Sequence, residues 1–151
     1  MDPHYRHTQI GWAVIIPALG VAALTAALLE LGHVTLFVPV VMGALLVALL
    51  VLFAWLTVTV DDEAVDLRFG LRGFHQRTPL SEIAAADAVR NSWLAGWGIR
   101  VIPGGRLYNV SGLDAVRLQL TDGRVVRVGT DEPELLLAAV KAALTRMRAS
   151  R

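Results

Sequence analysis

The 151-residue chain has no cysteine, a single lysine and long stretches without any charge. The lack of cysteine excludes disulfide bonds, thiolate catalysis and cysteine-ligated metal sites. Lys141 is the one lysine, and with 13 arginines the formal net charge is only +1. Such a small excess does not give the strongly basic surface that is typical of nucleic-acid binding. We therefore expect no nucleic-acid partner.

Charge is absent from two long apolar runs, residues 10–29 and residues 34–56. A bilayer's hydrocarbon core is about 30 Å thick, and a helix that rises about 1.5 Å per residue crosses it with roughly 20 apolar residues. The first run exceeds the ~7–15 residues of a signal-peptide core, and a second run follows at once. We therefore predict two transmembrane helices. The predicted segments are an N-terminal tail (1–9), the first helix (10–31), an external turn (32–33), the second helix (34–56) and a further domain (57–151).

The orientation of the spans is predicted from the basic residues that flank them, because cytoplasmic loops are enriched in lysine and arginine. Arg6 precedes the first run, and Arg68, Arg72 and Arg77 follow the second, whereas the turn between the runs has no basic residue. We therefore expect both termini in the cytoplasm. Alanines at four-residue intervals in both runs permit close helix packing, either within one chain or between copies in a homo-oligomer.

From residue 57 the pattern changes to an alternation of apolar and polar residues, which is typical of half-buried strands. Short alternating segments are separated by turn sequences, among them Asp122-Gly123, a strong hairpin signal. Residues 83–90 are rich in alanine and also suit a short helix, but their place between strands favours a strand. The pattern predicts about seven strands, at residues 57–60, 65–69, 83–90, 98–102, 107–110, 116–120 and 126–128.

The last predicted element is an amphipathic helix that begins near Asp131. Asp131 and Glu134 have the spacing of a capping box. Leu136, Val140 and Met147 recur at helical intervals. The resulting apolar stripe needs a surface to cover, and the open end of a small barrel is the expected one.

About seven short strands followed by one amphipathic helix is the element order of a pleckstrin-homology (PH)-like barrel. Three segments carry a closer likeness, residues 93–100 (WLAGWGIR), 107–112 (LYNVSG) and 129–134 (GTDEPE). With the apolar runs, the chain resembles the bacterial membrane-anchored PH-domain proteins. The resemblance implies a membrane α-helical hairpin and a mainly-β PH-like barrel capped by the C-terminal helix, in a bacterial cytoplasmic membrane. It also implies no catalytic residue and no cofactor.

The sequence contains no arrangement of side chains that is typical of catalysis or metal binding. His4 and His7 lie three residues apart but lack neighbouring ligands, and the other two histidines are isolated. Neither a nucleophile elbow nor a phosphate-binding loop with its lysine is present. We therefore expect a protein that is not an enzyme and that holds no metal.

Two tryptophans, Trp93 and Trp97, lie four residues apart beside glycines, with Arg100 close behind. In one interpretation the rings fill the barrel core or plug its open end. In another they lie at the membrane–water boundary, where indole rings concentrate, or form with Arg100 a hot spot for a protein partner. The candidate contact residues of this region are Trp93, Trp97, Arg100, Arg106 and Tyr108.

The leading hypothesis is a non-enzymatic integral membrane protein whose hairpin tethers a PH-like interaction domain for protein partners or self-association. A first alternative is an anionic-lipid sensor, with Arg68, Arg72 and Arg77 as the headgroup contacts. Acidic residues between positions 61 and 66 oppose an anionic ligand there. A second alternative is a small accessory subunit of a membrane complex.

Overall fold

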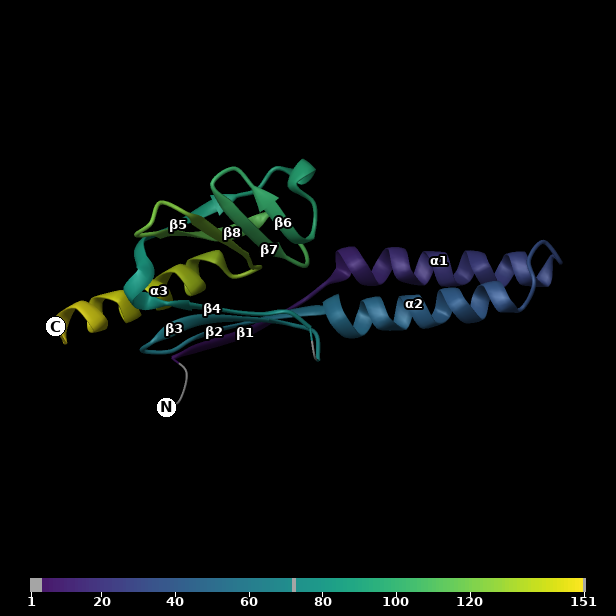
Figure 1. Cartoon of the computed structure of the whole chain (residues 1–151), viewed down its shortest axis with the longest axis horizontal. Coiled ribbons are helices and arrows are strands. Elements are labelled where there is room, and N and C mark those ends of the chain that lie inside the picture. The colour runs from purple at the N-terminus through teal and green to yellow at the C-terminus, as the bar shows by residue number, and fades with distance from the viewer. Residues whose placement is uncertain (1–3, 72, 151) are drawn as a thin grey trace.

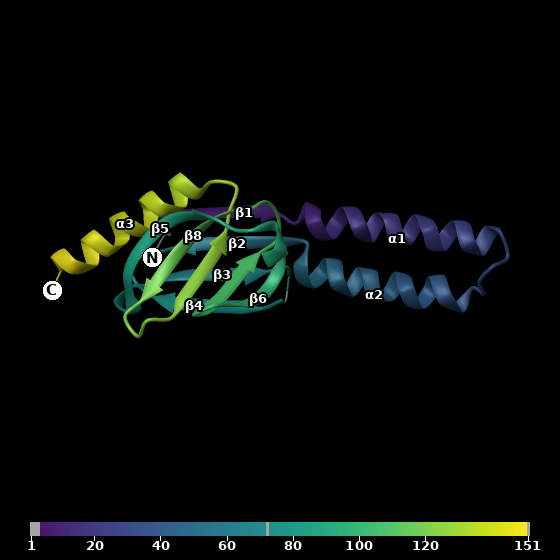
Figure 2. The same cartoon turned by 90° about the horizontal axis from the view of Figure 1, so that it is seen from above.

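A computed structural model describes residues 4–71 and 73–150 of the chain. Two apolar helices, α1 (Trp12–Glu30) and α2 (Phe37–Phe53), lie side by side and antiparallel, and they project away from the rest of the molecule (Figures 1 and 2). By length and composition, α1 could cross a membrane, whereas α2 is a shorter apolar helix of 17 residues. We call this pair the hairpin.

The hairpin is apolar on all sides, and its side chains are hardly covered by protein. Ala18 and Thr25 are the buried residues of α1, and α2 has none. Large side chains such as Leu24, Phe37 and Leu45 are exposed. A helix that is apolar all round belongs in a protein core or in a membrane, and within the described residues no protein surface encloses this one.

The chain enters the hairpin from a strand rather than from a tail. Strand β1 (Tyr5–Ile10) pairs antiparallel with β2 (Trp55–Val60), from Tyr5 opposite Val60 to Ile10 opposite Trp55. The prediction of a tail at residues 1–9 is therefore wrong for residues 5–9, Ile10 belongs to this strand and not to the predicted helix, and residues 1–3 lie outside the described part. Residues 5–10 are mostly polar, so the strand depends on pairing with the edge of β2 and not on an apolar face of its own.

The β region consists of two sheets. The first has the order β1-β2-β3-β4 and is antiparallel, with β3 (Ala64–Phe69) and β4 (His75–Pro79). The second has the order β5-β8-β9-β7-β6, in which β7 and β9 pair in parallel. No ladder between described residues joins the two sheets into one barrel. The second sheet consists of β5 (Ile83–Arg90), β6 (Gly98–Ile102), β7 (Gly105–Asn109), β8 (Asp114–Leu120) and β9 (Val125–Gly129).

The strand prediction for residues 83–90 is confirmed by β5, which pairs with β8 in the second sheet. A short 3₁₀ helix, η1 (Leu80–Glu82), connects β4 to β5 and so carries the chain from one sheet to the other. The apolar residues of both sheets and of the C-terminal helix α3 (Pro133–Ala149) share one buried core. The alternation in the sequence therefore gives the core faces of the strands.

Helix α3 closes one side of the space between the sheets. It packs against β5 and β8 and also contacts β2, and it buries Leu136 and Val140. The predicted capping box is wrong, because Glu132 is the N-cap residue and makes no side-chain cap. Instead, the Thr130 hydroxyl accepts a hydrogen bond from the Glu132 N–H at 3.0 Å, and Pro133 supplies the first turn.

Candidate functional site

The hairpin is joined to the first sheet by backbone hydrogen bonds. The Gly11 N–H donates to the Ala54 carbonyl at 2.7 Å, and the Leu71 N–H donates to the Val51 carbonyl at 3.1 Å. Gly70 lies beside this junction with φ +55°, and a Cβ there would lie only 2.7 Å from the carbonyl oxygen of Leu52. The hydrogen bonding of the sheet thus continues into the ends of both helices, with no unpaired linker between the hairpin and the β region.

Tryptophans mark this junction. Trp12 is the first residue of α1, and Trp55 is the first residue of β2. Trp93 lies in a short 3₁₀ helix, η2 (Trp93–Ala95), and Trp97 follows it in the connection between β5 and β6. Trp93 is 70% exposed and Trp97 is 41% exposed, so the interpretation that these two rings fill the core is wrong. The Trp97 indole N–H donates instead to the Gly112 carbonyl at 3.2 Å.

Trp97 forms one wall of an apolar groove between the domain and the hairpin, which we call the junction groove. Its volume is about 530 Å³. The hairpin contributes the beginning of α1 and the end of α2, and the domain contributes residues 96–100 and Val110. Apart from Arg100, the lining residues are uncharged: Ala13, Val14, Leu49, Phe53, Gly96, Trp97, Gly98, Ile99 and Val110.

Arg100 lies at this groove and folds back over the preceding turn. Its Nε–H donates to the Trp97 carbonyl at 3.1 Å. Its guanidinium lies above Gly96, where a Cβ would come within 3.5 Å of Nη2. No ion pair of Arg100 occurs among residues 4–71 and 73–150. The guanidinium therefore has unused hydrogen-bond donors at the rim of the groove.

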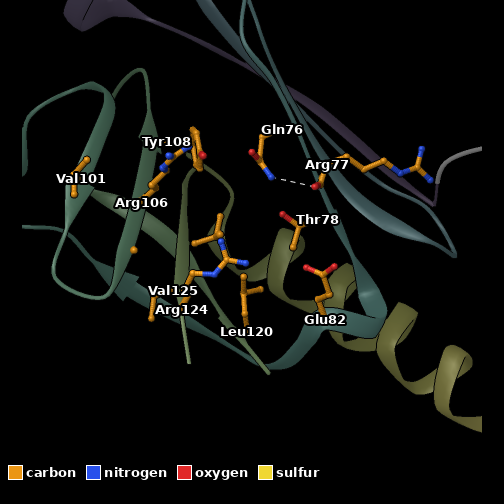
Figure 3. A pocket seen from close by; sticks show the side chains of 12 residues that line it. Gln76, Arg77, Thr78, Glu82, Val101, Arg106, Tyr108, Leu120, Arg124 and Val125 are labelled. Carbon is orange, nitrogen blue, oxygen red and sulfur yellow. Dashed lines mark hydrogen bonds between the residues drawn. The ribbon is translucent and has the colours of Figure 1, made fainter. Parts of the chain in front are cut away.

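A second hollow lies between the two sheets, with a volume of about 380 Å³. We call it the inter-sheet cleft. Figure 3 shows Gln76 and Thr78 pointing from β4 into this cleft, towards Arg106 of β7, whereas the side chain of Arg77 points away. Arg106 is exposed and has no ion pair in the described part of the chain. The cleft thus brings polar groups of both sheets together around one unpaired arginine.

Tyr108 also lines this cleft but belongs to the core. It is 1% exposed, and its ring stacks on Phe74 with 5.7 Å between centroids. Phe69 lies 6.3 Å from Tyr108 and 6.0 Å from Phe53, the last residue of α2. This aromatic cluster links both sheets to the hairpin. The prediction of Tyr108 as a contact residue for a partner is therefore corrected to a packing role.

Arg68 and Arg77, two of the three candidate headgroup arginines, lie on the outer face of the first sheet in neighbouring strands. Arg77 is paired with Glu63 at 2.8 Å and lies 3.8 Å from Asp66. Arg68 is exposed and makes no ion pair with a described residue. Arg72 lies outside the described residues. Of these two arginines, Arg77 is compensated by neighbouring carboxylates and Arg68 is not.

Three histidines each lie beside a carboxylate. The His4 Nε2 lies 2.8 Å from Asp62, the His7 Nε2 lies 2.7 Å from Asp131, and the His75 Nε2 lies 2.7 Å from Asp66. No group of three histidine, aspartate or glutamate side chains in the described ranges could share a metal ion. Hydrogen bonds from His4 and Arg146 lower the pKa of the Asp62 carboxyl.

Tyr5 connects β1 to the start of α3. Its hydroxyl donates to the Glu132 carboxylate at 3.4 Å. Burial and the charge of Glu132 raise the pKa of Tyr5 to about 12. Together with the contact between His7 and Asp131, this bond fastens the N-terminal strand to the C-terminal helix.

No protein-family model, no curated protein and no solved structure matches this chain. The functional argument therefore starts from the hairpin, the junction groove and the inter-sheet cleft.

Proposed function

We propose that the chain is an integral membrane protein, in which α1 and α2 cross the bilayer and hold a non-enzymatic interaction domain against one membrane surface. The pairing of β1 with β2 carries this proposal. β1 precedes the hairpin and β2 follows it, and the two strands are paired along their whole length. Both therefore lie on the same side of any membrane, so if α1 crosses the bilayer, α2 must cross back.

The dimensions of the hairpin support a crossing. At 1.5 Å per residue, the 19 residues of α1 span about 28 Å, and the 17 residues of α2 span about 26 Å. The exposed residues Leu31 and Leu36 extend the apolar length at the turn. The total approaches the hydrocarbon thickness of about 30 Å, and Trp12 and Trp55 lie at the domain end, where interfacial aromatic residues concentrate.

The arrangement of charges supports an orientation with the domain and both termini in the cytoplasm. Arg68 lies on the outer face of the first sheet opposite Thr57, two residues from Trp55, and Arg6 lies further along the same face, opposite Thr59. The turn between the helices has no arginine or lysine. When positive residues flank the spans on one side and not on the other, the positive side is retained in the cytoplasm.

The β region is proposed to be PH-like and to bind a protein partner at the inter-sheet cleft. Two sheets followed by a C-terminal helix support the resemblance. β4 and β6 are edge strands, and on β6 the side chain of Val101 is 88% exposed. An edge strand offers unpaired backbone groups to an extended segment. Val101 lies opposite Arg106 in the ladder, so an acidic side chain on that segment could reach this guanidinium.

Crossing of the membrane can be tested with single cysteines, because the natural chain has none. Thr35→Cys places a thiol in the hairpin turn, and Thr121→Cys places one in the turn between β8 and β9. We expect a membrane-impermeant maleimide to label position 35 in intact cells and position 121 only after permeabilisation. Labelling of both thiols from the same side would contradict the two crossings.

Partner binding can be tested in native membranes with a photo-crosslinking residue at position 101. We expect a discrete adduct that disappears with Arg106→Glu. Arg148→Glu is the matched control, because Arg148 is an exposed arginine that does not line the cleft. An adduct that survives Arg106→Glu, or the absence of any adduct, would contradict partner binding at the cleft.

A further inference from the structure

The junction groove combines an apolar floor with a single cation at its rim. Its floor is made by residues such as Val14, Leu49 and Phe53, which lie at the domain end of the hairpin. If the hairpin crosses a bilayer, this end lies at the level of the lipid headgroups and the first methylene groups. A groove at that depth faces lipid.

We propose that the junction groove binds one anionic phospholipid, with the phosphate on Arg100 and the upper part of an acyl chain between Trp97, Leu49 and Phe53. This inference rests on the membrane insertion proposed above. It adds a specific lipid site, on a surface different from the inter-sheet cleft.

The charges of the groove favour a phosphate. Arg100 is the one charged residue among those that line the groove. One of its five N–H donors is used by the Trp97 carbonyl, and a guanidinium with free donors binds phosphate oxygens in bidentate geometry. The bond to Trp97 also fixes the guanidinium at the rim. The guanidinium of Arg100 is therefore already positioned for an anion in the lipid-free protein.

The shape of the groove favours one lipid over a partner helix. Its volume of about 530 Å³ is within the range of roughly 300–1,000 Å³ that is typical of small-ligand sites. A helix with side chains is about 10–12 Å wide and would need a longer channel. Trp93 and Leu94, which are 70% and 76% exposed, lie in the same connection and can enter the interface beside the lipid, since indole rings are favoured there.

The test uses the full-length chain in vesicles of equal parts phosphatidylglycerol and phosphatidylcholine, with bromine on the acyl chains of one lipid or of the other. Trp97 is made the only tryptophan by Trp12→Phe, Trp55→Phe and Trp93→Phe. We expect brominated phosphatidylglycerol to quench Trp97 more strongly than brominated phosphatidylcholine, although the membrane composition is the same. A second reporter that keeps only Trp12, the first residue of α1, should be quenched by both brominated lipids and so reports insertion of the hairpin.

Arg100→Gln is expected to reduce the preference of Trp97 for the anionic lipid about fivefold, because it removes the charge-assisted hydrogen bonds. Arg124→Gln is the matched control, since Arg124 is an exposed arginine in the turn between β8 and β9 and does not line the groove. Equal quenching of Trp97 by both brominated lipids would overturn the lipid site. Retention of the preference in Arg100→Gln would overturn the role of this arginine.

Failure of membrane insertion is measured separately. If carbonate washing extracts the chain and neither brominated lipid quenches the Trp12 reporter, the proposed function fails and the lipid site fails with it. If the chain resists carbonate and Trp12 is quenched, but Trp97 shows no preference, only the lipid site is refuted. Native mass spectrometry of the unmodified chain released from the same vesicles gives a second readout, and we expect one retained phosphatidylglycerol per chain that is lost in Arg100→Gln.

Discussion

Truncation of Tyr108 should destabilise the whole β region, because its ring is the centre of the aromatic cluster that links the two sheets and the hairpin. The ring is 1% exposed and has neighbours at 5.7 and 6.3 Å. Replacing a fully buried large aromatic side chain with alanine costs about 3–5 kcal/mol. For a domain of about 100 residues, each kcal/mol lowers the melting temperature by about 4–8 °C, so Tyr108→Ala should lower it by about 12 °C or more.

The assay is thermal unfolding of the full chain in mild detergent, followed by the β-sheet signal in circular dichroism. Tyr108→Phe is the matched control, because it keeps the ring and its contacts with Phe69 and Phe74, and no hydrogen bond of the tyrosine hydroxyl is found in the described residues. This control should melt close to the parent. Val101→Ala, at an exposed position in the neighbouring strand, should change stability by no more than about 0.5 kcal/mol. A Tyr108→Ala chain that melts with the parent would refute the assignment of Tyr108 to the core.

Three further changes test other parts of the structure. Gly70→Ala should destabilise the junction, because the new Cβ would clash with backbone at a position with φ +55°. The expected result is faster proteolysis between the hairpin and the β region. Gly20→Ala is the control, because a Cβ there would lie in open space. Leu136→Ala should cost about 2–5 kcal/mol in unfolding experiments, because it empties a core position beneath α3. The pKa of Tyr5 rises from 10.0 to about 12 on folding, so this group's contribution to stability is present below pH 10 and is lost as the pH rises towards 12; Tyr5→Phe should flatten the stability profile over that interval.

The strands with alternating side chains and recognisable turns could be predicted from the sequence. Asp122 and Gly123 lie in the turn between β8 and β9, where Gly123 has φ +86° and the Asp122 carboxylate accepts from the Arg124 N–H. Asp61 similarly accepts from the N–H groups of Glu63 and Ala64 in the turn between β2 and β3. In these cases the signal is local, because turn chemistry and side-chain period are properties of a few neighbouring residues.

The elements that depend on distant pairing could not be predicted in the same way. β1 has no continuous apolar face, and it forms a strand because its backbone pairs with the edge of β2. The parallel pairing of β7 with β9 also could not be predicted from local sequence, since about 20 residues separate paired positions such as Arg106 and Val126. The junction groove was missed for the same reason. Residues such as Leu49 and Ile99 form its walls only after the fold brings the hairpin and β6 together.

Tyr108 and Trp97 show that the burial of an aromatic side chain cannot be predicted from its sequence neighbours. Tyr108 stands next to the polar Asn109 and Trp97 stands between two glycines, yet Tyr108 is buried and Trp97 is at the surface. The difference arises from the register of β7, which turns Tyr108 and Val128 of the paired strand into the core. Trp97 precedes β6 and has no strand partner to turn it inwards. Its surface position leaves the indole to form a wall of the junction groove.

The hairpin is inserted in the chain between two paired strands, β1 and β2. Because the ladder continues from Ile10 and Trp55 into the helices, the domain cannot rotate freely about the anchor. Thr57 lies two residues beyond Trp55 and pairs with Arg68, which places this arginine about 7 Å further from the hairpin. That distance corresponds to the headgroup layer when the tryptophans lie at its lower edge. If the hairpin crosses a bilayer as proposed, Arg68 then lies at the depth of the headgroups, and the paired strands set the tilt of the domain relative to the hairpin.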